Sequence, residues 1–321
     1  MSWNDTVKNT MNEEVILTVI DINNRCIEEL HHGNLIPTLS ELHEAMVILK
    51  QGVAITDSSS QSSHLVGVPA SIATAVSPQS THVIPNNHQQ QQSAVVSVRI
   101  QFQRADPFTD QSSYPYILEV STLSTPIIFI NHLVVIIAVD RNATRSSMVE
   151  QQNQSVNDIS DTISTEDLHL LSAAILYNMG LLFQQYANTC HLYNQNASQS
   201  ATILFRASKI YELLIQLCSH RNIWNTSTGN TLDANQNRCC MRMIQTIAYN
   251  NYSNICYKLG NYNMFRHCMN VVQYQLIVLS SSSTYSSNEN MASGEEEILN
   301  ELRLNTLVAK LFPVPTLASA A

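Results

Sequence analysis

At residues 249–269 the chain reads Tyr249-Asn-Asn-Tyr-Ser-Asn-Ile-Cys-Tyr-Lys-Leu-Gly-Asn-Tyr-Asn-Met-Phe-Arg-His-Cys-Met269, which predicts two helices joined at a glycine. Apolar residues recur every three or four positions on both sides of Gly260, and glycine suits the left-handed turn that ends a helix. A hairpin of this kind buries its apolar face only against neighbouring hairpins. We therefore expect further hairpins and a concave surface suited to binding.

The register of a tetratricopeptide repeat accounts for the spacing of these residues. It turns the following residues inward: Tyr249, Tyr252, Ser253, Cys256, Phe265, Met269 and Val272. An earlier pair of helices fits as well, with Leu176, Met179, Gly180 and Phe183 followed by Ala201, Phe205 and Ser208. Gly180 and Ala201 lie 21 residues apart, whereas the repeat has about 12 residues there. We therefore expect a lengthened loop between Cys190 and Ser200.

Composition divides the remainder of the chain. Helical spacing at 12–50 predicts an N-terminal hairpin that turns at Gly33, with Thr10 and Glu13 as a capping box before its first helix. A Ser- and Gln-rich stretch at 56–93 predicts a disordered linker, and β-branched runs at 94–140 predict a small β-rich insertion. After a polar linker at 141–164, helical spacing predicts a repeat domain at 165–312, with loops at 188–200, 219–238 and 280–294, and then a tail at 313–321. The predicted fold is mainly α and tetratricopeptide-like.

Four stretches carry a family resemblance: Asn23-Asn-Arg-Cys-Ile…Gly33, Leu176-Tyr-Asn-Met-Gly-Leu-Leu-Phe, Ala248-Tyr-Asn-Asn-Tyr-Ser-Asn-Ile-Cys-Tyr-Lys-Leu-Gly260 and Leu302-Arg-Leu-Asn-Thr-Leu…Ala318-Ser-Ala-Ala. They resemble a family of uncharacterised diatom tetratricopeptide-like proteins over about half of the chain, at 20–50 and 165–321. The resemblance implies a helical-repeat architecture. It implies little about function, because that family has no established activity.

Charge and composition exclude several classes of partner. The net charge is −9 and no run of basic residues is present, so nucleic acid is not an expected partner. The longest apolar run, at 126–139, is interrupted by Asn131 and His132 and is too short to span a bilayer. Seven scattered cysteines and no apolar leader predict a reducing compartment, the cytoplasm with the nucleus as an alternative.

Three asparagines are the sharpest candidates for a binding site. Asn24, Asn178 and Asn251 occupy the same position in the first helix of their hairpins, which lines the concave face of a repeat array. An asparagine amide offers both a donor and an acceptor, so these residues are expected to bind the main chain of a peptide. The alternative is that they cap or cross-link helices within a repeat. Tyr257 is a surface candidate, because the register turns Tyr249, Tyr252 and Tyr262 inward.

No pattern predicts catalysis, a cofactor or a metal site. The pairs Cys190-His191, Cys218-Ser-His220, Cys239-Cys240 and His267-Cys268 lack the spacing of a zinc knuckle. Cys240, Cys256 and Cys268 lie on apolar stripes, where cysteine acts as a small core residue. We expect a non-enzymatic adaptor that binds a peptide or partner protein on the concave face. The alternative is a structural or self-associating protein whose groove is filled by its own residues 313–321 or by the β insertion.

Overall fold

The computed structural model describes residues 3–31, 35–60, 96–104, 126–140, 165–192, 197–219, 232–281 and 293–311, and the fold within these ranges is mainly α. Seven helices and two strands lie in these ranges, and none of the helices combines the length and apolar character needed to cross a bilayer. In chain order they are α1 (Trp3–His31), α2 (Leu35–Ser60), β1 (Val96–Arg104), β2 (His132–Asp140), α5 (Thr165–Leu192), α6 (Ala197–Ser219), α8 (Leu232–Lys258), α9 (Tyr262–Ser281) and α11 (Ser293–Leu311).

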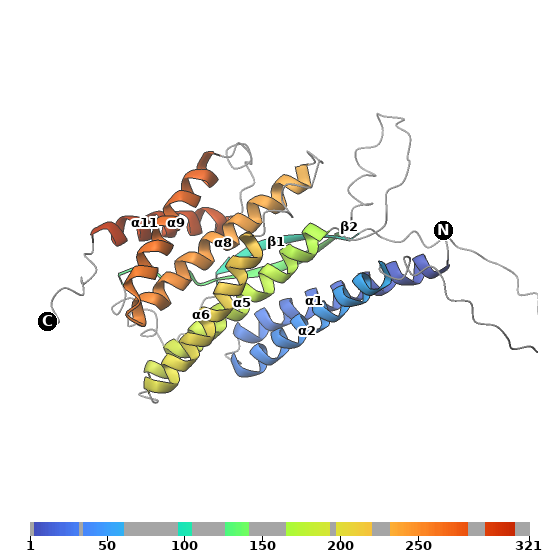
Figure 1. Cartoon of the computed structure of the whole chain (residues 1–321), viewed down its shortest axis with the longest axis horizontal. Coiled ribbons are helices and arrows are strands. Elements are labelled where there is room, and N and C mark those ends of the chain that lie inside the picture. Colours follow the sequence, from blue (N-terminus) through green and yellow to red (C-terminus); the bar gives the residue numbers. More distant parts are fainter. Residues whose placement is uncertain are drawn as a thin grey trace, which may run out of the picture.

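The helices pack as successive hairpins. α1 packs against α2, α5 against α6 and α8 against α9, and each hairpin also contacts the next one along the chain (Figure 1). α11 packs against α9 at the C-terminal end of the row. One buried cluster runs through all of the hairpins, from Val19 in α1 to Leu302 in α11. The prediction of a mainly α chain built from helical hairpins is confirmed.

The turn after α8 follows the prediction made from Gly260. This glycine has φ of 73°, and the N–H groups of Gly260 and Asn261 donate to the carbonyl oxygens of Tyr257 (3.0 Å) and Cys256 (2.8 Å). These two bonds are those of a Schellman motif, which satisfies the last carbonyls of a helix. The side chain of Asn261 then accepts a hydrogen bond from the N–H of Met264 (3.3 Å), so it caps the start of α9.

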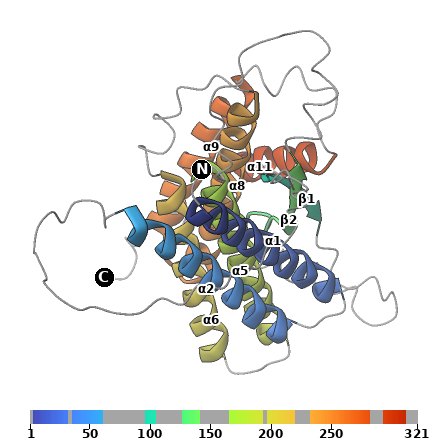
Figure 2. The same ribbon diagram turned by 90° about the vertical axis from the view of Figure 1, so that its right-hand side faces the viewer.

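The two strands form an antiparallel sheet on one side of the hairpins. Phe102 pairs with Val134 and Arg104 pairs with His132. The sheet lies against α1, α5 and α11, on the side opposite to α2 and α6 (Figure 2). The predicted strands at 94–102 and 133–139 are therefore present with shifted ends, whereas 127–130, which begins in a bend, belongs to neither strand. The predicted run at 116–120 lies outside the described residues.

The expected long loop between α5 and α6 is wrong. α5 continues to Leu192 and α6 starts at Ala197, so most of the extra residues lengthen the two helices. The residue of α6 that faces Gly180 is Tyr211, whose ring would lie 2.9 Å from a Cβ on Gly180. Ala201 and Phe205, predicted to point inward, are exposed.

Helices also extend beyond the predicted boundaries elsewhere. α1 begins at Trp3, so Thr10 and Glu13 lie within the helix and not at its start. α2 continues to Ser60, past the start of the predicted linker at 56, and α8 begins at Leu232 within the predicted loop 219–238. Once a helix is nucleated each further residue adds a hydrogen bond, which carries it through residues of low propensity. The Gly33 turn, 61–93, 141–164 and the tail 313–321 lie outside the described residues.

Candidate peptide-binding groove

Asparagine side chains on α1, α5, α8 and α11 hold the main chain of residues 127–136. We call these four helices the inner helices and residues 127–136 the clamped segment. The Asn251 amide on α8 donates to the carbonyl oxygen of Ile130 (3.0 Å) and accepts from its N–H (3.0 Å). On α5, Asn178 makes the same two bonds to Val134, both at 2.9 Å. Each amide therefore takes both polar groups of a single residue.

Two further asparagines repeat this arrangement at the ends of the clamped segment. Asn24 on α1 donates to the carbonyl oxygen of Ile136 (2.6 Å) and accepts from its N–H (3.1 Å). Asn305 on α11 donates to the carbonyl oxygen of Ile128 (2.7 Å) and accepts from its N–H (2.6 Å). We call Asn24, Asn178, Asn251 and Asn305 the asparagine ladder. The three residues singled out in the sequence belong to it, and the main chain that they hold is part of this same chain.

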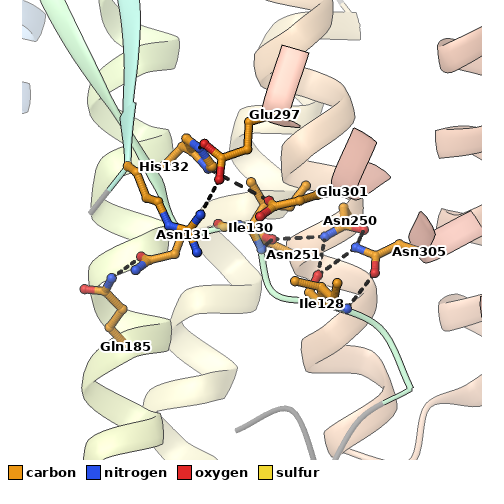
Figure 3. A network of polar contacts seen from close by, with 11 residues as sticks. Ile128, Ile130, Asn131, His132, Gln185, Asn250, Asn251, Glu297, Glu301 and Asn305 are labelled. Atoms are coloured by element: carbon orange, nitrogen blue, oxygen red, sulfur yellow. Dashed lines mark hydrogen bonds and ion pairs between the residues drawn. The ribbon is translucent and has the colours of Figure 1, made fainter. Parts of the chain in front are cut away.

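A second pair of asparagines links neighbouring members of the ladder. Asn23 donates to the carbonyl oxygen of Val134 (3.1 Å) and accepts from the Asn178 amide (3.0 Å). Asn250 does the same on α8: it donates to the carbonyl oxygen of Ile128 (3.1 Å) and accepts from the Asn305 amide (2.8 Å). The α1–α5 and α8–α11 helix pairs thus carry equivalent clamps (Figure 3 shows the second).

The spacing of the ladder follows the alternation of an extended chain. In such a chain, main-chain groups face the same side at every second residue, and each residue adds about 3.3 Å. The ladder holds the evenly spaced positions 128, 130, 134 and 136 and does not bind 132. The step from Asn251 on α8 to Asn178 on α5 therefore covers four residues of the clamped segment, whereas the other two steps cover two.

The clamped segment is most deeply buried where Asn178 and Asn251 hold it. The side chains of Ile130, Leu133, Val134 and Ile136 have no exposed surface, and Asn178, Asn251 and Asn305 are at most 1 % exposed. A buried main-chain group without a partner costs about 1–3 kcal/mol, so Asn178 and Asn251 satisfy groups that lie away from water, whereas the bonds of Asn24 and Asn305 are part-buried. β1 covers the other edge of β2, so the strand has the ladder on one edge and a paired strand on the other.

At residue 132, which the ladder does not bind, the contacts are made by side chains. Asn131 is hydrogen-bonded to Gln185, and the His132 ring, 1 % exposed, places Nε2 3.4 Å from Glu297 Oε2 and Nδ1 4.0 Å from Glu301 Oε2 (Figure 3). Burial raises the pKa of Glu301 to about 6, and Glu297 adds to that rise whereas Arg104 opposes it. Arg104 also pairs with Glu297.

Tyr257, the fourth candidate from the sequence, lies in a different environment. Its half-buried ring packs edge-on against Phe265 and Tyr262, with centroids 5.3 and 5.5 Å apart. The next residue, Lys258, donates from Nζ to the side-chain oxygen of Asn188 (2.7 Å), and burial lowers the pKa of its ammonium to about 8. These contacts join α8 to α9 and α5 and do not reach the clamped segment.

The cysteines and histidines assemble no metal site in the part of the chain that the structure describes: no three His, Cys, Asp or Glu side chains there are arranged to hold an ion. Cys240, Cys256 and Cys268 are buried, as the stripes predicted. Burial raises the pKa of the Cys256 thiol to about 11, which keeps it neutral and a poor nucleophile at neutral pH.

Sequence reasoning missed Asn305, Asn23 and Asn250. The repeated Asn-Asn dipeptide at 23–24 and 250–251 is the signal for the two linking residues, because both members of each pair face the same segment. Asn305 has no such signal, since the residues around it do not fit the repeat register. Comparisons with protein-family models, with curated proteins and with solved structures find no match for this chain.

Proposed function

We propose that the chain is a non-enzymatic interaction module of tetratricopeptide-like repeats, and that its inner face binds an extended peptide through the peptide's main chain. The clamped segment occupies that groove as a resident ligand. The observation that carries this proposal is the ladder itself, in which four amides each take the N–H and C=O of one residue. Because those groups are the same in every peptide, this chemistry also suits a segment of another protein.

The walls of the groove restrict which peptides fit. Positions 130, 133, 134 and 136 are fully buried, so a ligand needs apolar side chains there. The ligand class is therefore an extended, largely apolar protein segment that competes with the clamped segment for the same asparagines. A tethered segment acts at an effective concentration in the millimolar range, so a competitor has to be present at comparable concentration or during folding.

Capture during refolding tests the proposal on the full chain. The protein is unfolded in urea and refolded with about 1 mM of a labelled peptide of residues 126–138 that carries a lysine tag for solubility. Gel filtration then measures the label that comigrates with the protein. We expect saturable capture in the wild-type chain and at least severalfold less in an Asn178→Ala/Asn251→Ala variant that still folds.

Backbone N-methylation provides a matched control that leaves every side chain unchanged. Methyl groups on the nitrogens of Ile128 and Ile130 remove donors that face Asn305 and Asn251. Methyl groups on Phe129 and Asn131 alter nitrogens that, by alternation along an extended chain, face away from the ladder. The first peptide should lose capture and the second should retain it. Equal capture of both would contradict main-chain recognition.

A second candidate function is structural, and the complete burial of Ile130, Leu133, Val134 and Ile136 favours it. In that case the clamped segment is a permanent part of the fold that joins the hairpins, and the ladder never binds a partner. Normal refolding without any peptide capture would support this structural role. Capture that depends on the methylation position would support the adaptor.

A further inference from the structure

Charged side chains contact the clamped segment at His132. At 128, 130, 134 and 136 the ladder binds main-chain groups, which are the same for every residue type. The ladder does not bind residue 132, where the contacts are made by the imidazole side chain. Beyond the apolar character required at the buried positions, we therefore expect charge selection between peptides at this position.

The surroundings of His132 are acidic. Glu297 and Glu301 lie one helical turn apart on α11 and both face the imidazole, which is 1 % exposed (Figure 3). Arg104, the cross-strand neighbour of His132, pairs with Glu297. With both carboxyl groups ionised, these three side chains carry a net charge of −1. The Glu297 and Glu301 side chains are partly exposed (40 % and 20 %), whereas residue 132 is buried. A cation at residue 132 would be removed from water and would need these carboxylates as partners, which an uncharged or acidic residue could not use in the same way.

We propose that Glu297 and Glu301 form a specificity notch that selects a cationic residue at the ligand position now held by His132. This inference rests on the proposed function and specifies the charge of one residue of the ligand. The preferred segment is extended and carries histidine, lysine or arginine at this position. It also has apolar residues at the positions that correspond to Ile130, Leu133 and Val134, which are two residues before, one residue after and two residues after the cationic residue.

Stability measurements on the intact chain test the notch without any external peptide. Lysine and methionine have similar size and shape, so His132→Lys and His132→Met differ mainly in charge. At pH 7.5 we expect His132→Lys to unfold at higher urea concentration than His132→Met. In a Glu297→Gln/Glu301→Gln background the order should reverse, because a buried ammonium then lacks its carboxylates.

Glu296→Gln is the matched control, since Glu296 lies on the same helix but is exposed. It should leave the difference between the lysine and methionine variants unchanged. Methionine equal to or better than lysine in the wild-type background would overturn the notch. So would folding of His132→Met but not of His132→Lys.

The refolding capture supplies the second measurement, which decides if neither variant at residue 132 folds. Peptides of residues 126–138 with lysine or glutamate at the histidine position are compared, and the lysine peptide should be captured about tenfold better. Equal capture of the two peptides would overturn the notch while leaving main-chain binding intact. No capture of any peptide would contradict the proposed function, and the urea midpoints would still report on the notch.

Discussion

Asn24 and Asn251 hold the clamped segment at places six residues apart: Asn24 bonds both main-chain groups of Ile136, and Asn251 bonds both of Ile130. The asparagine before each of them bonds the carbonyl group two residues earlier in the segment and the amide of another ladder residue. Asn23 bonds Val134 and Asn178 in this way. Asn250 bonds Ile128 and Asn305. The groove is therefore built from two equivalent clamps. Their offset of six residues is an even number, which keeps the same edge of an extended chain facing the helices throughout.

Removing a ladder amide should cost more stability the more deeply it is buried. Asn251→Ala leaves the N–H and C=O of Ile130 without their partner in a site with no exposed surface. At about 1–3 kcal/mol for each unpaired group, we expect a loss of about 2–5 kcal/mol in the free energy of unfolding. Asn24→Ala, at a half-buried site, should cost less. Urea denaturation measures both, with exposed Asn263→Ala as a control expected to stay within about 0.5 kcal/mol of the wild type.

Gly180 is required by the ring that packs against it. Alanine is a better helix former than glycine by about 1 kcal/mol, yet a Cβ on Gly180 would lie 2.9 Å from the buried ring of Tyr211. We expect Gly180→Ala to destabilise the chain by about 1–3 kcal/mol, because the fully buried Tyr211 ring would have to shift to admit the methyl group. Replacing Tyr211 by leucine in the same chain should recover part of the loss. A rise in melting temperature for Gly180→Ala alone would show that α5 and α6 are further apart than described.

The half-buried side chain of Lys258 should make stability depend on pH in the alkaline range. Burial lowers its pKa from 10.5 to about 8, so the folded chain disfavours the charged form. A depressed folded pKa contributes stability that is present above pH 10.5 and is lost as pH falls through about 8. The free energy of unfolding of the wild type, measured relative to Lys258→Met, should therefore decrease as the pH is lowered from 10.5 to about 8. A constant difference across this range would mean that Lys258 is as hydrated in the folded chain as in the unfolded one.

The helical hairpins and three of the four ladder residues could be predicted from the sequence, because helical periodicity is local. Asn24, Asn178 and Asn251 share one register position, and that position sets which face of the helix they occupy. Asn305 could not be predicted, because its role depends on a contact with Ile128, which lies 177 residues away in the sequence. The continuation of α5 to Leu192 escaped for another reason: extra residues between two helices lengthen either the loop or the helices, and local spacing does not distinguish these outcomes.

The clamped segment illustrates a different limit. The β-branched residues at 133–139 predicted a strand, and the sequence reading included the possibility that the insertion fills the groove. Periodicity gives no information on which main-chain edge of a strand faces a partner. That edge is decided here by the row of amides on α1, α5, α8 and α11, and it becomes visible only when the helices are placed side by side.

Hydrogen exchange of the amides of Ile130 and Val134 shows whether the asparagine ladder holds the clamped segment. We expect slow exchange at both amides in the native wild-type chain, because each N–H donates to a buried asparagine oxygen. We also expect Asn251→Ala to increase the exchange rate of the Ile130 amide more than that of the Val134 amide, and Asn178→Ala to do the reverse. Rapid exchange of both amides in the wild-type chain, under conditions in which the helices remain protected, would show that the asparagine ladder does not hold this segment.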